Sequence, residues 1–381
     1  MNGVTIGIVG ARGINNYGGF ETVVGEIAPR LVSRGHRVYC SSESQAKETK
    51  SAIYRGVELR FFPFLFPHNY TLRKLFEILY DWYFVLLFSF VNRCDVIYCL
   101  GLGSGPVILL SRITGTRAIS NIDGLEWRRQ KFTSLERSLL KGIFATTSFL
   151  FAETIVIDNM MLLEYIPGRF RNKTVYITNG VGETDLIPWN HSTIDHYSNG
   201  HESDIPDNRY FLVVARLEPE NNIHTIVQGF MKGDSRIPLV IVGDFVSLEY
   251  ERTVKHLASQ ESKTNKVFFF GAIYNKEHLD MLRCHCFAYI HGHSVGGTNP
   301  SLLEAMSAKC LVIAHDNPFN REVCGDSALF FDSASDLSRR LNDVGRSVFA
   351  LQGMKELALK RVRDRYNWET IAENCDDLFR E

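Results

Sequence analysis

The chain has 381 residues, enough for two domains of ordinary size. Its hydrophobic content of 45% and charged content of 22% are typical of a globular protein, and no internal repeat or low-complexity tract appears. The net charge of −1 hides an asymmetry, because residues 1–180 carry 21 Lys and Arg against 14 Asp and Glu, whereas the remainder carries 21 against 29. The basic half indicates either an anionic partner, such as a phosphorylated substrate or a membrane surface, or solvated charge without a partner.

The eight cysteines predict a reducing compartment and exclude a zinc site. Cys94, Cys99 and Cys310 sit in apolar runs, where a free thiol behaves as a small hydrophobic group. Cys284 and Cys286 form a C-x-C pair, but no second pair follows at a spacing that zinc requires. The start, "MNGVTIGIVG", has no basic segment and no cleavage site, so we expect a first strand there and not a signal peptide.

Strands and helices alternate along the chain, which predicts a parallel α/β architecture. In the first half, short β-branched runs predict strands at 4–9, 37–42, 95–100, 117–122, 154–158 and 174–178. Helical patterns lie between several of them, at Phe20–Ser33 and at about 134–149. The pattern restarts in the second half, with strands predicted at 210–215, 238–243, 266–271, 287–292, 310–315 and 328–331.

The most apolar segment is Leu75 to Arg93, "LFEILYDWYFVLLFSFVNR". Glu77 and Asp81 interrupt its start and leave about ten apolar residues, too few to cross a bilayer. The segment is either a core helix or an aromatic-rich helix at a membrane interface, helped by Arg73, Lys74 and Arg93.

The turn at Asn179-Gly180 and the polar stretch 190–208 separate the two halves. We predict a first doubly wound, Rossmann-like domain at 1–182, a second at 183–364, and a terminal amphipathic helix at 365–381 that packs back toward the first domain. Ligands of such sheets bind at the carboxyl ends of the strands, so a cleft between the domains would suit an enzyme that joins two substrates.

The loop after the first strand, "GARGINNYGGFET", holds glycines suited to a phosphate at a helix start. Gly7, Gly10 and Gly13 form only a loose dinucleotide fingerprint, because the helix starts later, near Gly18 and Gly19. Arg12 adds a fixed positive charge, and the alternative is that these glycines only turn the chain. A second glycine loop, "HGHSVGGTNPSLLEAM", leads into a helix at Pro300, again with amides and a dipole that attract an anion.

Five motifs in order give the chain a specific resemblance: "VGARGINNYGGFETVVGEIAPRLVSRGHRV", "NIDGLEWRRQKF", "ITNGV", "ARLEPENNI" and "HGHSVGGTNPSLLEAM". They resemble the retaining GT-B glycosyltransferases of the group-1, or GT4, family, and more narrowly its rhamnosyltransferase-like branch with a DUF1972-type amino-terminal domain, which builds capsule and O-antigen units. The resemblance covers essentially the whole chain. It implies a GT-B fold in which the second domain holds a nucleotide sugar and the first holds the acceptor.

Two positions depart from the family pattern. Arg216 matches the arginine that binds the donor diphosphate and neutralises charge on the leaving group, but the usual lysine five residues later is Asn221. Glu304 matches the second glutamate of the E-x7-E motif, which accepts from the nucleotide ribose, but the first glutamate is replaced by Gly296. His293 or the amides of 296–298 are candidates to contact the sugar instead, and polarity at a strand end is the alternative for His291 and His293.

The resemblance and the residues together predict three sets. The catalytic set is Asp123, which would orient or deprotonate the acceptor hydroxyl, Arg216 and Glu304. The donor set is Gly18, Gly19, Arg216, Gly243, Gly271, His293, Gly297, Thr298, Asn299, Pro300, Ser301 and Glu304. The acceptor set is Arg12, Tyr17, Glu21, Asp123, Arg128 and Arg129. Each has a structural alternative, such as an ion pair of Arg216 with Glu218 or Glu220, or an Asp-Gly turn at Asp123.

The resemblance therefore implies a hexosyltransferase that moves a sugar, best rhamnose from dTDP-rhamnose, onto a lipid-linked saccharide (a polyprenyl diphosphate) in bacterial surface polysaccharide synthesis. It would be cytoplasmic, peripheral at the inner face of the cytoplasmic membrane, and without a nucleic-acid partner. No Asp-x-Asp motif occurs, so we expect no metal and no cofactor. The alternatives are a UDP- or GDP-sugar donor, an NAD-dependent oxidoreductase, a nucleotide-sugar epimerase, and a silent binding protein.

Overall fold

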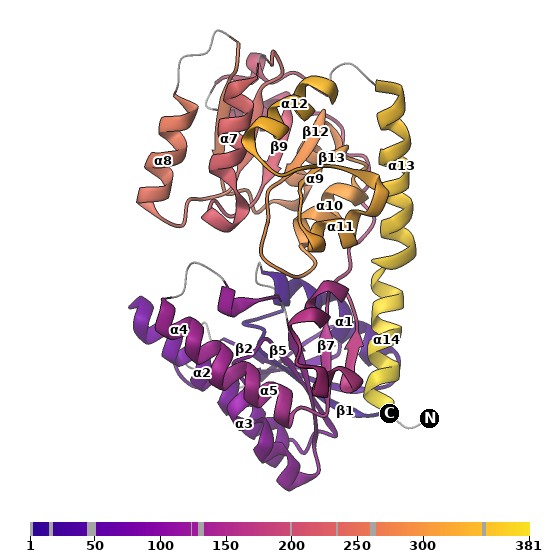
Figure 1. The fold of residues 1–381 in the computed structure, drawn as a ribbon. Coiled ribbons are helices and arrows are strands. Elements are labelled where there is room, and N and C mark those ends of the chain that lie inside the picture. Colours follow the sequence, from indigo (N-terminus) through magenta and orange to yellow (C-terminus); the bar gives the residue numbers. More distant parts are fainter. Residues whose placement is uncertain are drawn as a thin grey trace. The chain divides into compact units, whose positions relative to one another are not determined.

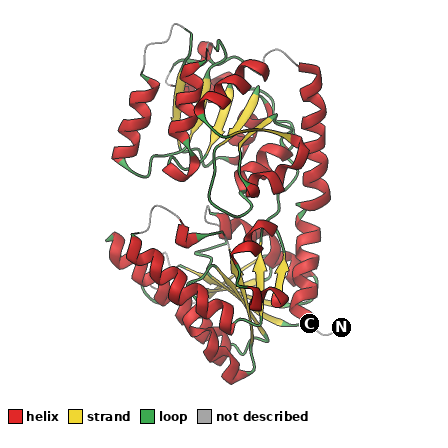
Figure 2. Cartoon of the chain, viewed as in Figure 1, coloured by secondary structure: helices red, strands yellow, loops and turns green. Residues whose placement is uncertain are grey.

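The computed structural model describes residues 3–14, 18–43, 51–122, 124–128, 133–198, 200–233, 235–259, 264–344 and 348–381. The chain divides into two compact units: unit 1 is Met1–Gly180 with Trp368–Glu381, and unit 2 is Val181–Asn367. The divisions lie two residues before the predicted 182 and three residues after the predicted 364. Each unit has a sheet with helices on both faces, as Figures 1 and 2 show.

Unit 1 contains a sheet of eight strands in the order β3-β4-β2-β1-β5-β6-β7-β8. The strands are β1 Thr5–Val9, β2 Arg37–Ser42, β3 Ser51–Tyr54, β4 Val57–Phe61, β5 Val96–Leu100, β6 Arg117–Ile122, β7 Thr154–Ile157 and β8 Thr174–Tyr176. All pairs are parallel except β3 with β4, a hairpin turned by Arg55 and Gly56, which both have positive φ. The chain winds outward on both sides of β1, so the switch point of this sheet lies between β1 and β5.

Side chains of the strands alternate between two cores. Ile6, Ile8 and Tyr98 face one core, which the first helix covers, whereas Val9 and Ile97 face the other core, which the second and third helices cover. The helices of this unit are α1 Gly19–Ser33, α2 Tyr70–Leu86, which continues as the π-helical η1 Leu87–Val91, α3 Gly105–Ser111, α4 Ser134–Leu139, the π-helical η4 Leu140–Ala145, and α5 Thr146–Phe151. Short 3-10 turns complete it: η2 Arg112–Thr114, η3 Glu126–Arg128, η5 Met160–Tyr165 and η6 Gly168–Lys173.

The last helix, α14 Trp368–Arg380, returns to unit 1, as predicted for the terminal helix. It packs against α1 and adds Trp368, Ile371, Cys375, Leu378 and Phe379 to the core on that face of the sheet. Unit 1 is therefore completed by residues from both ends of the chain.

Unit 2 contains a parallel sheet of six strands in the order β11-β10-β9-β12-β13-β14. The strands are β9 Phe211–Val214, β10 Leu239–Val242, β11 Val267–Gly271, β12 Ala288–His291, β13 Val312–His315 and β14 Ala328–Phe331. The helices are α6 His191–Ser198, α7 Ile223–Lys232, α8 Leu248–Ala258, α9 Lys276–Cys284, α10 Pro300–Ser307, α11 Pro318–Cys324, α12 Ala334–Val344 and α13 Val348–Arg365, with 3-10 turns η7 Glu202–Asp204, η8 Pro219–Asn221 and η9 Gly325–Ser327. The switch point lies between β9 and β12, so the loops that follow these two strands flank one crevice of the sheet.

Candidate active site

The loops after β9 and β12 are joined at the switch point of unit 2. His293 Nδ1 lies 2.8 Å from Asn221 Oδ1, and His293 Nε2 lies 2.9 Å from the carbonyl of Val295. Ser294 donates from its amide and its hydroxyl to the carbonyl of Glu220, at 3.0 and 2.9 Å. A Cβ at Gly292 would collide with the carbonyl oxygen of Asn221. The loops therefore pack backbone to backbone, which only glycine at 292 permits.

Arg216 lies in the loop after β9 and is 63% exposed. Its guanidinium makes an ion pair of 3.2 Å with the buried carboxylate of Glu218, and Asn221 Nδ2 donates to its carbonyl at 2.7 Å. The predicted ion pair with Glu218 therefore exists, but the exposed guanidinium still has donors for a second anion, because an arginine carries five N–H groups. Asn221 has a supporting role: it ties the backbone of Arg216 to His293.

The glycine loop after β12 ends in a capped helix. Gly296 and Gly297 are buried with φ of 60° and 74°, a conformation that favours glycine. Asn299 Oδ1 accepts from the amide and the hydroxyl of Ser301, so Asn299 caps α10 with Pro300 at its first position. Asn299 and Ser301 thus have structural roles here. An anion at this helix start would instead contact the buried Gly296–Thr298 turn and the positive end of the α10 dipole.

Glu304 lies one turn into α10 and pairs with Arg283 of α9, a residue that sequence reasoning missed. Arg283 is 2% exposed and also donates to Asp280 Oδ1 at 3.1 Å. Burial alone would lower the pKa of Arg283, but Glu304 and Asp280 raise it, so the guanidinium stays charged. Glu304 is about one-third exposed, so its carboxylate is oriented by Arg283 and still reaches solvent. The sequence held one signal for Arg283: Asp280 lies three residues before it, a spacing that lets the two side chains pair on one face of a helix.

Gly243 directly follows β10, the neighbour of β9, and Gly271 ends β11, the next strand outward. Gly243 has φ of 140°, and a Cβ there would collide with the carbonyl of Ala215. Its amide donates to the carbonyl of Gly271 at 2.8 Å. Gly243 therefore lets neighbouring strand ends approach closely. The structure brings both glycines to the same edge of the sheet as Arg216 and His293.

Unit 1 has its own cluster at the switch point between β1 and β5. The buried carboxylate of Glu21 accepts from the amide of Arg12 at 2.9 Å, and a Cβ at Gly18 would collide with this carboxylate. The Arg12 guanidinium lies 4.3 Å from the ring centroid of Tyr80 and 5.4 Å from that of Phe66. Gly19 begins α1 with open space around it. Gly18 and Gly19 belong to this unit, whereas the other predicted donor residues belong to unit 2.

A cavity of about 340 Å³ opens at this cluster. It mixes charged and apolar walls, and its lining includes Arg12, Glu21, Lys74, Asp81, Phe20, Leu139 and Phe144. Such a mixture suits a ligand with both polar and apolar parts. Arg128 lies elsewhere in the unit, where Nη1 donates to the hydroxyl of Tyr165 at 3.0 Å. Asp123, Tyr17 and Arg129 lie outside the described residues.

Comparisons with known proteins give the two units separate matches. Residues 200–347 match the family "Glycosyl transferases group 1", and residues 4–182 match the domain of unknown function DUF1972. Among solved structures, HepE from Anabaena with bound UDP and glucose aligns with TM-score 0.72 at 14% identity, over 98% of this chain and 99% of that one. Sucrose-phosphate synthase from Thermosynechococcus elongatus aligns with TM-score 0.76 at 15% identity, over 99% and 98% of the chains.

A trehalose-phosphate synthase from Burkholderia xenovorans aligns with TM-score 0.75 at 11% identity, over the full length of both chains. No curated protein matches. The chain is a GT-B glycosyltransferase. The α/β fold with two doubly wound domains and the enzyme class are thus confirmed, and the oxidoreductase and epimerase alternatives are not retained. In physical terms, nine residues separate the end of β1 from α1 of the glycosyltransferase, too long a loop for the dinucleotide fingerprint.

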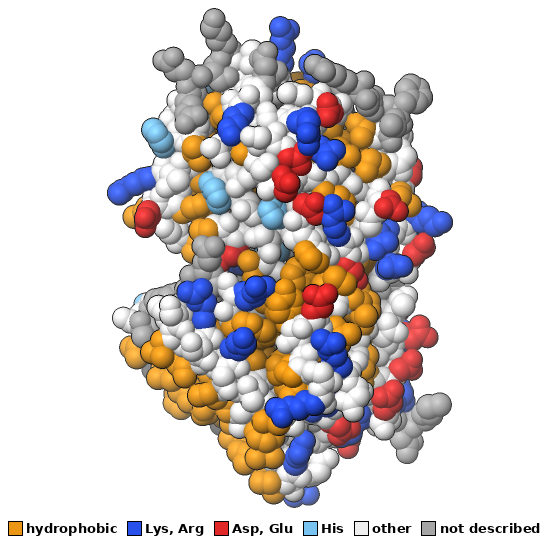
Figure 3. Space-filling model, in the orientation of Figure 1, with side chains coloured by type: hydrophobic (Ala, Val, Ile, Leu, Met, Phe, Trp, Pro, Cys, Tyr) orange, Lys and Arg blue, Asp and Glu red, His pale blue; other side chains and the backbone are white. Residues whose placement is uncertain are grey.

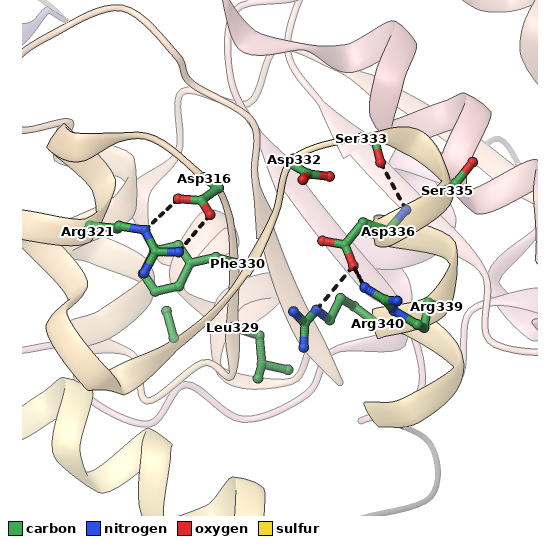
Figure 4. A pocket seen from close by; sticks show the side chains of 11 residues that line it. Asp316, Arg321, Leu329, Phe330, Asp332, Ser333, Ser335, Asp336, Arg339 and Arg340 are labelled. Carbon is green, nitrogen blue, oxygen red and sulfur yellow. Dashed lines mark hydrogen bonds and ion pairs between the residues drawn. The ribbon is translucent and has the colours of Figure 1, made fainter.

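A hollow of about 650 Å³ lies elsewhere in unit 2 of the glycosyltransferase. Figure 4 shows its arginines turned onto aspartates: Arg321 binds Asp316 through both oxygens at 2.5 and 2.6 Å, and Arg339 and Arg340 face Asp336. Because each of these arginines already binds a carboxylate of the protein, the hollow is a poor site for a diphosphate. No three His, Cys, Asp or Glu side chains cluster as metal ligands among the described residues.

Proposed function

We propose that this glycosyltransferase moves a sugar from a nucleoside diphosphate, held at the β9–β12 switch point of unit 2, to a lipid-linked saccharide held by unit 1. The observation that carries the proposal is the joined pair of loops at that switch point, with an exposed guanidinium on one loop and buried glycines leading to a helix start on the other. Arg216 and the dipole of α10 would stabilise the negative charge that builds on the departing diphosphate. The carboxylate of Glu304, oriented by Arg283, would accept hydrogen bonds from the ribose hydroxyls.

The donor is proposed to be dTDP-rhamnose, and the product part of a bacterial capsule or O-antigen repeat. A UDP-sugar is the second candidate, supported by the likeness to HepE, whose structures hold UDP, UDP with glucose, and UDP-glucose. The transfer is proposed to retain the anomeric configuration: the acceptor hydroxyl attacks the face from which the diphosphate leaves, through an oxocarbenium-like state. In this proposal the protein works at the inner face of the cytoplasmic membrane.

A donor screen tests the proposal. Purified protein is incubated with dTDP-rhamnose, UDP-sugars and GDP-sugars and a polyprenyl-diphosphate saccharide, and the released nucleotide and the extended saccharide are measured. We expect transfer from one nucleotide class, and no transfer from any donor would contradict the proposed function.

Arg216→Ala tests the leaving-group assignment. Losing a guanidinium that meets the diphosphate should lower kcat by roughly 100-fold or more, the range seen when one preorganised donor is removed. Arg252→Ala on α8 is the control, because Arg252 is an exposed cation of the same unit. Glu304→Ala should likewise abolish transfer. Full activity in both Arg216→Ala and Glu304→Ala would refute this site.

Metal removal is a further test. Because Arg216 and α10 would take the place of a divalent ion at the diphosphate, we propose that transfer needs no metal. Activity should be the same after exhaustive treatment with EDTA as with added Mg²⁺ or Mn²⁺. A loss of activity with EDTA that Mg²⁺ restores would overturn this part of the proposal.

A further inference from the structure

A second hollow of unit 1, of about 380 Å³, is lined by cations and aromatic rings. Its walls are Trp127 and Arg128 of η3, Arg137, Ser138 and Lys141 of the run from α4 to η4, and Tyr165 at the end of η5. Three segments thus bring two guanidiniums and one ammonium to one opening, and no carboxylate is among the described residues that line it.

The cations of this pocket pair with no carboxylate in the part of the chain that the structure describes. Among the described residues, no ion pair or side-chain hydrogen bond engages Arg137 or Lys141. Arg128 is held by neutral groups, since Nη1 donates to the Tyr165 hydroxyl at 3.0 Å and the guanidinium lies 5.2 Å from the Tyr165 ring centroid. Converging like charges repel each other, so an anion with several oxygens would be stabilised here by charge-assisted hydrogen bonds.

The helical run that supplies Arg137 and Lys141 is itself fixed in place. Thr133 and Glu136 form a capping box at its start, and Lys74 of α2 pairs with Glu136 at 2.7 Å. These two contacts lower the pKa of Glu136 to about 2, Lys74 being the larger cause. The Glu136 carboxylate is therefore bound to Lys74 and does not neutralise the pocket.

The same run exposes apolar side chains on another face. Leu135, Leu139, Ile143 and Leu150 follow one another at spacings of four and seven residues, and each is exposed. Neighbouring α2 and η1 expose Leu72, Leu75, Leu79, Leu86 and Phe90, and the segment of α3 and η2 exposes Leu109, Leu110 and Ile113. We call these residues the apolar face. Figure 3 shows hydrophobic side chains gathered over this part of unit 1, at the lower left, with Lys and Arg among them.

The charges around the apolar face favour an anionic bilayer as its occupant. Four cations lie on or directly after its helices, and among the described residues none of them makes an ion pair: Arg93, Arg112, Arg137 and Lys141. The nearby acids are occupied, because Asp81 is buried and Glu77 and Glu136 pair with Arg73 and Lys74. An exposed apolar stripe with cations at its margins is the pattern of helices that lie in a lipid interface. No described helix is long and apolar enough to cross a membrane.

We propose that the pocket of Arg128, Arg137, Lys141 and Tyr165 binds the phosphate or diphosphate headgroup of the membrane-anchored acceptor lipid, while the apolar face rests in the bilayer that holds the lipid chain. This inference rests on the proposed function for the identity of the lipid as acceptor. A headgroup pocket beside a lipid-contacting helix face lets one helical run bind both parts of an amphipathic substrate.

A vesicle experiment tests the headgroup pocket. The full-length protein is sedimented with phosphatidylcholine vesicles that contain either undecaprenyl diphosphate or phosphatidylglycerol at equal surface charge. We expect tighter binding to the undecaprenyl diphosphate vesicles and competition by inorganic pyrophosphate. The Arg137→Ala/Lys141→Ala variant should lose about 100-fold in affinity for these vesicles, because each lost charge-assisted contact costs roughly tenfold. The control is Arg252→Ala/Lys255→Ala, which removes two exposed charges from α8 of unit 2.

Equal binding of the pocket variant and the wild type would overturn the pocket, as would equal binding of the wild type to the two anionic vesicles. Release of nucleotide from the sugar donor in the absence of acceptor is measured in parallel. The Arg137→Ala/Lys141→Ala variant should release nucleotide at the same rate as the wild type. A protein that binds the diphosphate vesicles but transfers no sugar refutes the proposed function alone, whereas a protein that transfers to a water-soluble acceptor but ignores the headgroup refutes this inference alone.

A second pair of variants tests the apolar face. Leu135→Glu and Ile113→Glu replace side chains that are 70% and 72% exposed, so the fold should tolerate both. Each should weaken vesicle binding at least several-fold while leaving pyrophosphate binding unchanged, and Ile53→Glu, at 77% exposure on β3, should change neither. Unchanged vesicle binding in both variants would overturn the bilayer contact. So would a stable wild-type dimer, seen by sedimentation velocity, that Leu135→Glu dissociates.

Discussion

At the scale of single residues, His291 is a buried group that makes the stability of unit 2 depend on pH. It ends β12, and its Nε2 has no hydrogen-bond partner in the part of the chain that the structure describes. Burial, with added repulsion from His293 and His315, holds the pKa of His291 well below its usual value. As pH falls below the ordinary histidine pKa, the unfolded chain therefore takes up a proton that the folded chain refuses.

We predict that the free energy of unfolding of unit 2 falls between pH 7 and pH 5, with His291 contributing a slope of up to about 1.4 kcal/mol per pH unit. His291→Gln should flatten this dependence, because the variant has no proton to gain at that site. Urea unfolding at a series of pH values measures the slope, and His201→Gln, at an exposed position, serves as the control. An identical slope in His291→Gln and wild type would contradict the prediction.

A second prediction at this scale concerns His293. Its ring joins Asn221 to the loop of Val295, so it positions Arg216 through the backbone that Asn221 holds. His293→Ala should weaken nucleoside diphosphate binding by about tenfold, the value of one or two hydrogen bonds, with a smaller change in melting temperature. Calorimetric titration with dTDP and UDP measures it. A variant that binds both nucleotides as tightly as the wild type would remove His293 from the site.

At the scale of elements, helices α9 and α10 are tied by Arg283, whose guanidinium binds Asp280 and Glu304. Removing the buried cation leaves two carboxylates without it, whereas removing Glu304 leaves Arg283 paired with Asp280. We therefore predict that Arg283→Met destabilises unit 2 by about 3–5 kcal/mol, the cost of breaking a buried pair, and Glu304→Gln by clearly less. Differential scanning calorimetry compares the two, and equal melting temperatures would contradict this ordering.

Gly292 sets how closely two other elements, the loops after β9 and β12, approach each other. We predict that Gly292→Ala forces the loops apart, because the new Cβ would collide with Asn221, and that it lowers both stability and nucleotide affinity. Gly353→Ala in α13, where no atom lies near the added Cβ, should instead be neutral or stabilising by up to about 1 kcal/mol. Unfolding curves and nucleotide titration on both variants give the comparison.

The elements also show how far the sequence could predict the structure. Every strand with a run of buried β-branched residues was predictable, because a parallel sheet covered on both faces needs such runs. The β3–β4 hairpin was missed, since both strands are short, β3 is an exposed edge strand, and the turn is Arg55-Gly56 and not the Asn-Gly signal. The loop residues at both switch points were predictable from glycines and resemblance. Arg283, Arg137 and Tyr165 were not, because only the fold brings their segments to their partners.

At the scale of the whole molecule, the chain leaves unit 1 at Gly180 and returns to it at Trp368. Unit 1 therefore needs both segments of the chain to complete its core. Helix α14 brings five buried apolar side chains to the core under α1, and its polar side pairs Glu369 with Arg30 and Asp376 with His36, at 2.8 and 2.6 Å. The Arg30–Glu369 pair is exposed on the Glu369 side and contributes little, whereas the His36 side chain is buried against Asp376. At about 1.5–3 kcal/mol for each buried side chain, the apolar contribution is on the order of 10 kcal/mol, which is as large as the stability of a typical domain.

We therefore predict that a protein ending at Asn367 loses the folded state of unit 1 while unit 2, Val181–Asn367, still unfolds cooperatively. Calorimetry should show one unfolding transition in the truncated protein. The full chain should show either two transitions or a single transition with a larger unfolding enthalpy. A synthetic peptide of residues 368–381 added to the truncated protein should restore part of the lost transition, because the missing core can be supplied in trans. Leu357→Ala, an exposed change on α13, is the control. If the truncated protein kept both transitions at the wild-type temperatures, α14 would be dispensable and unit 1 would be stable without its returning helix.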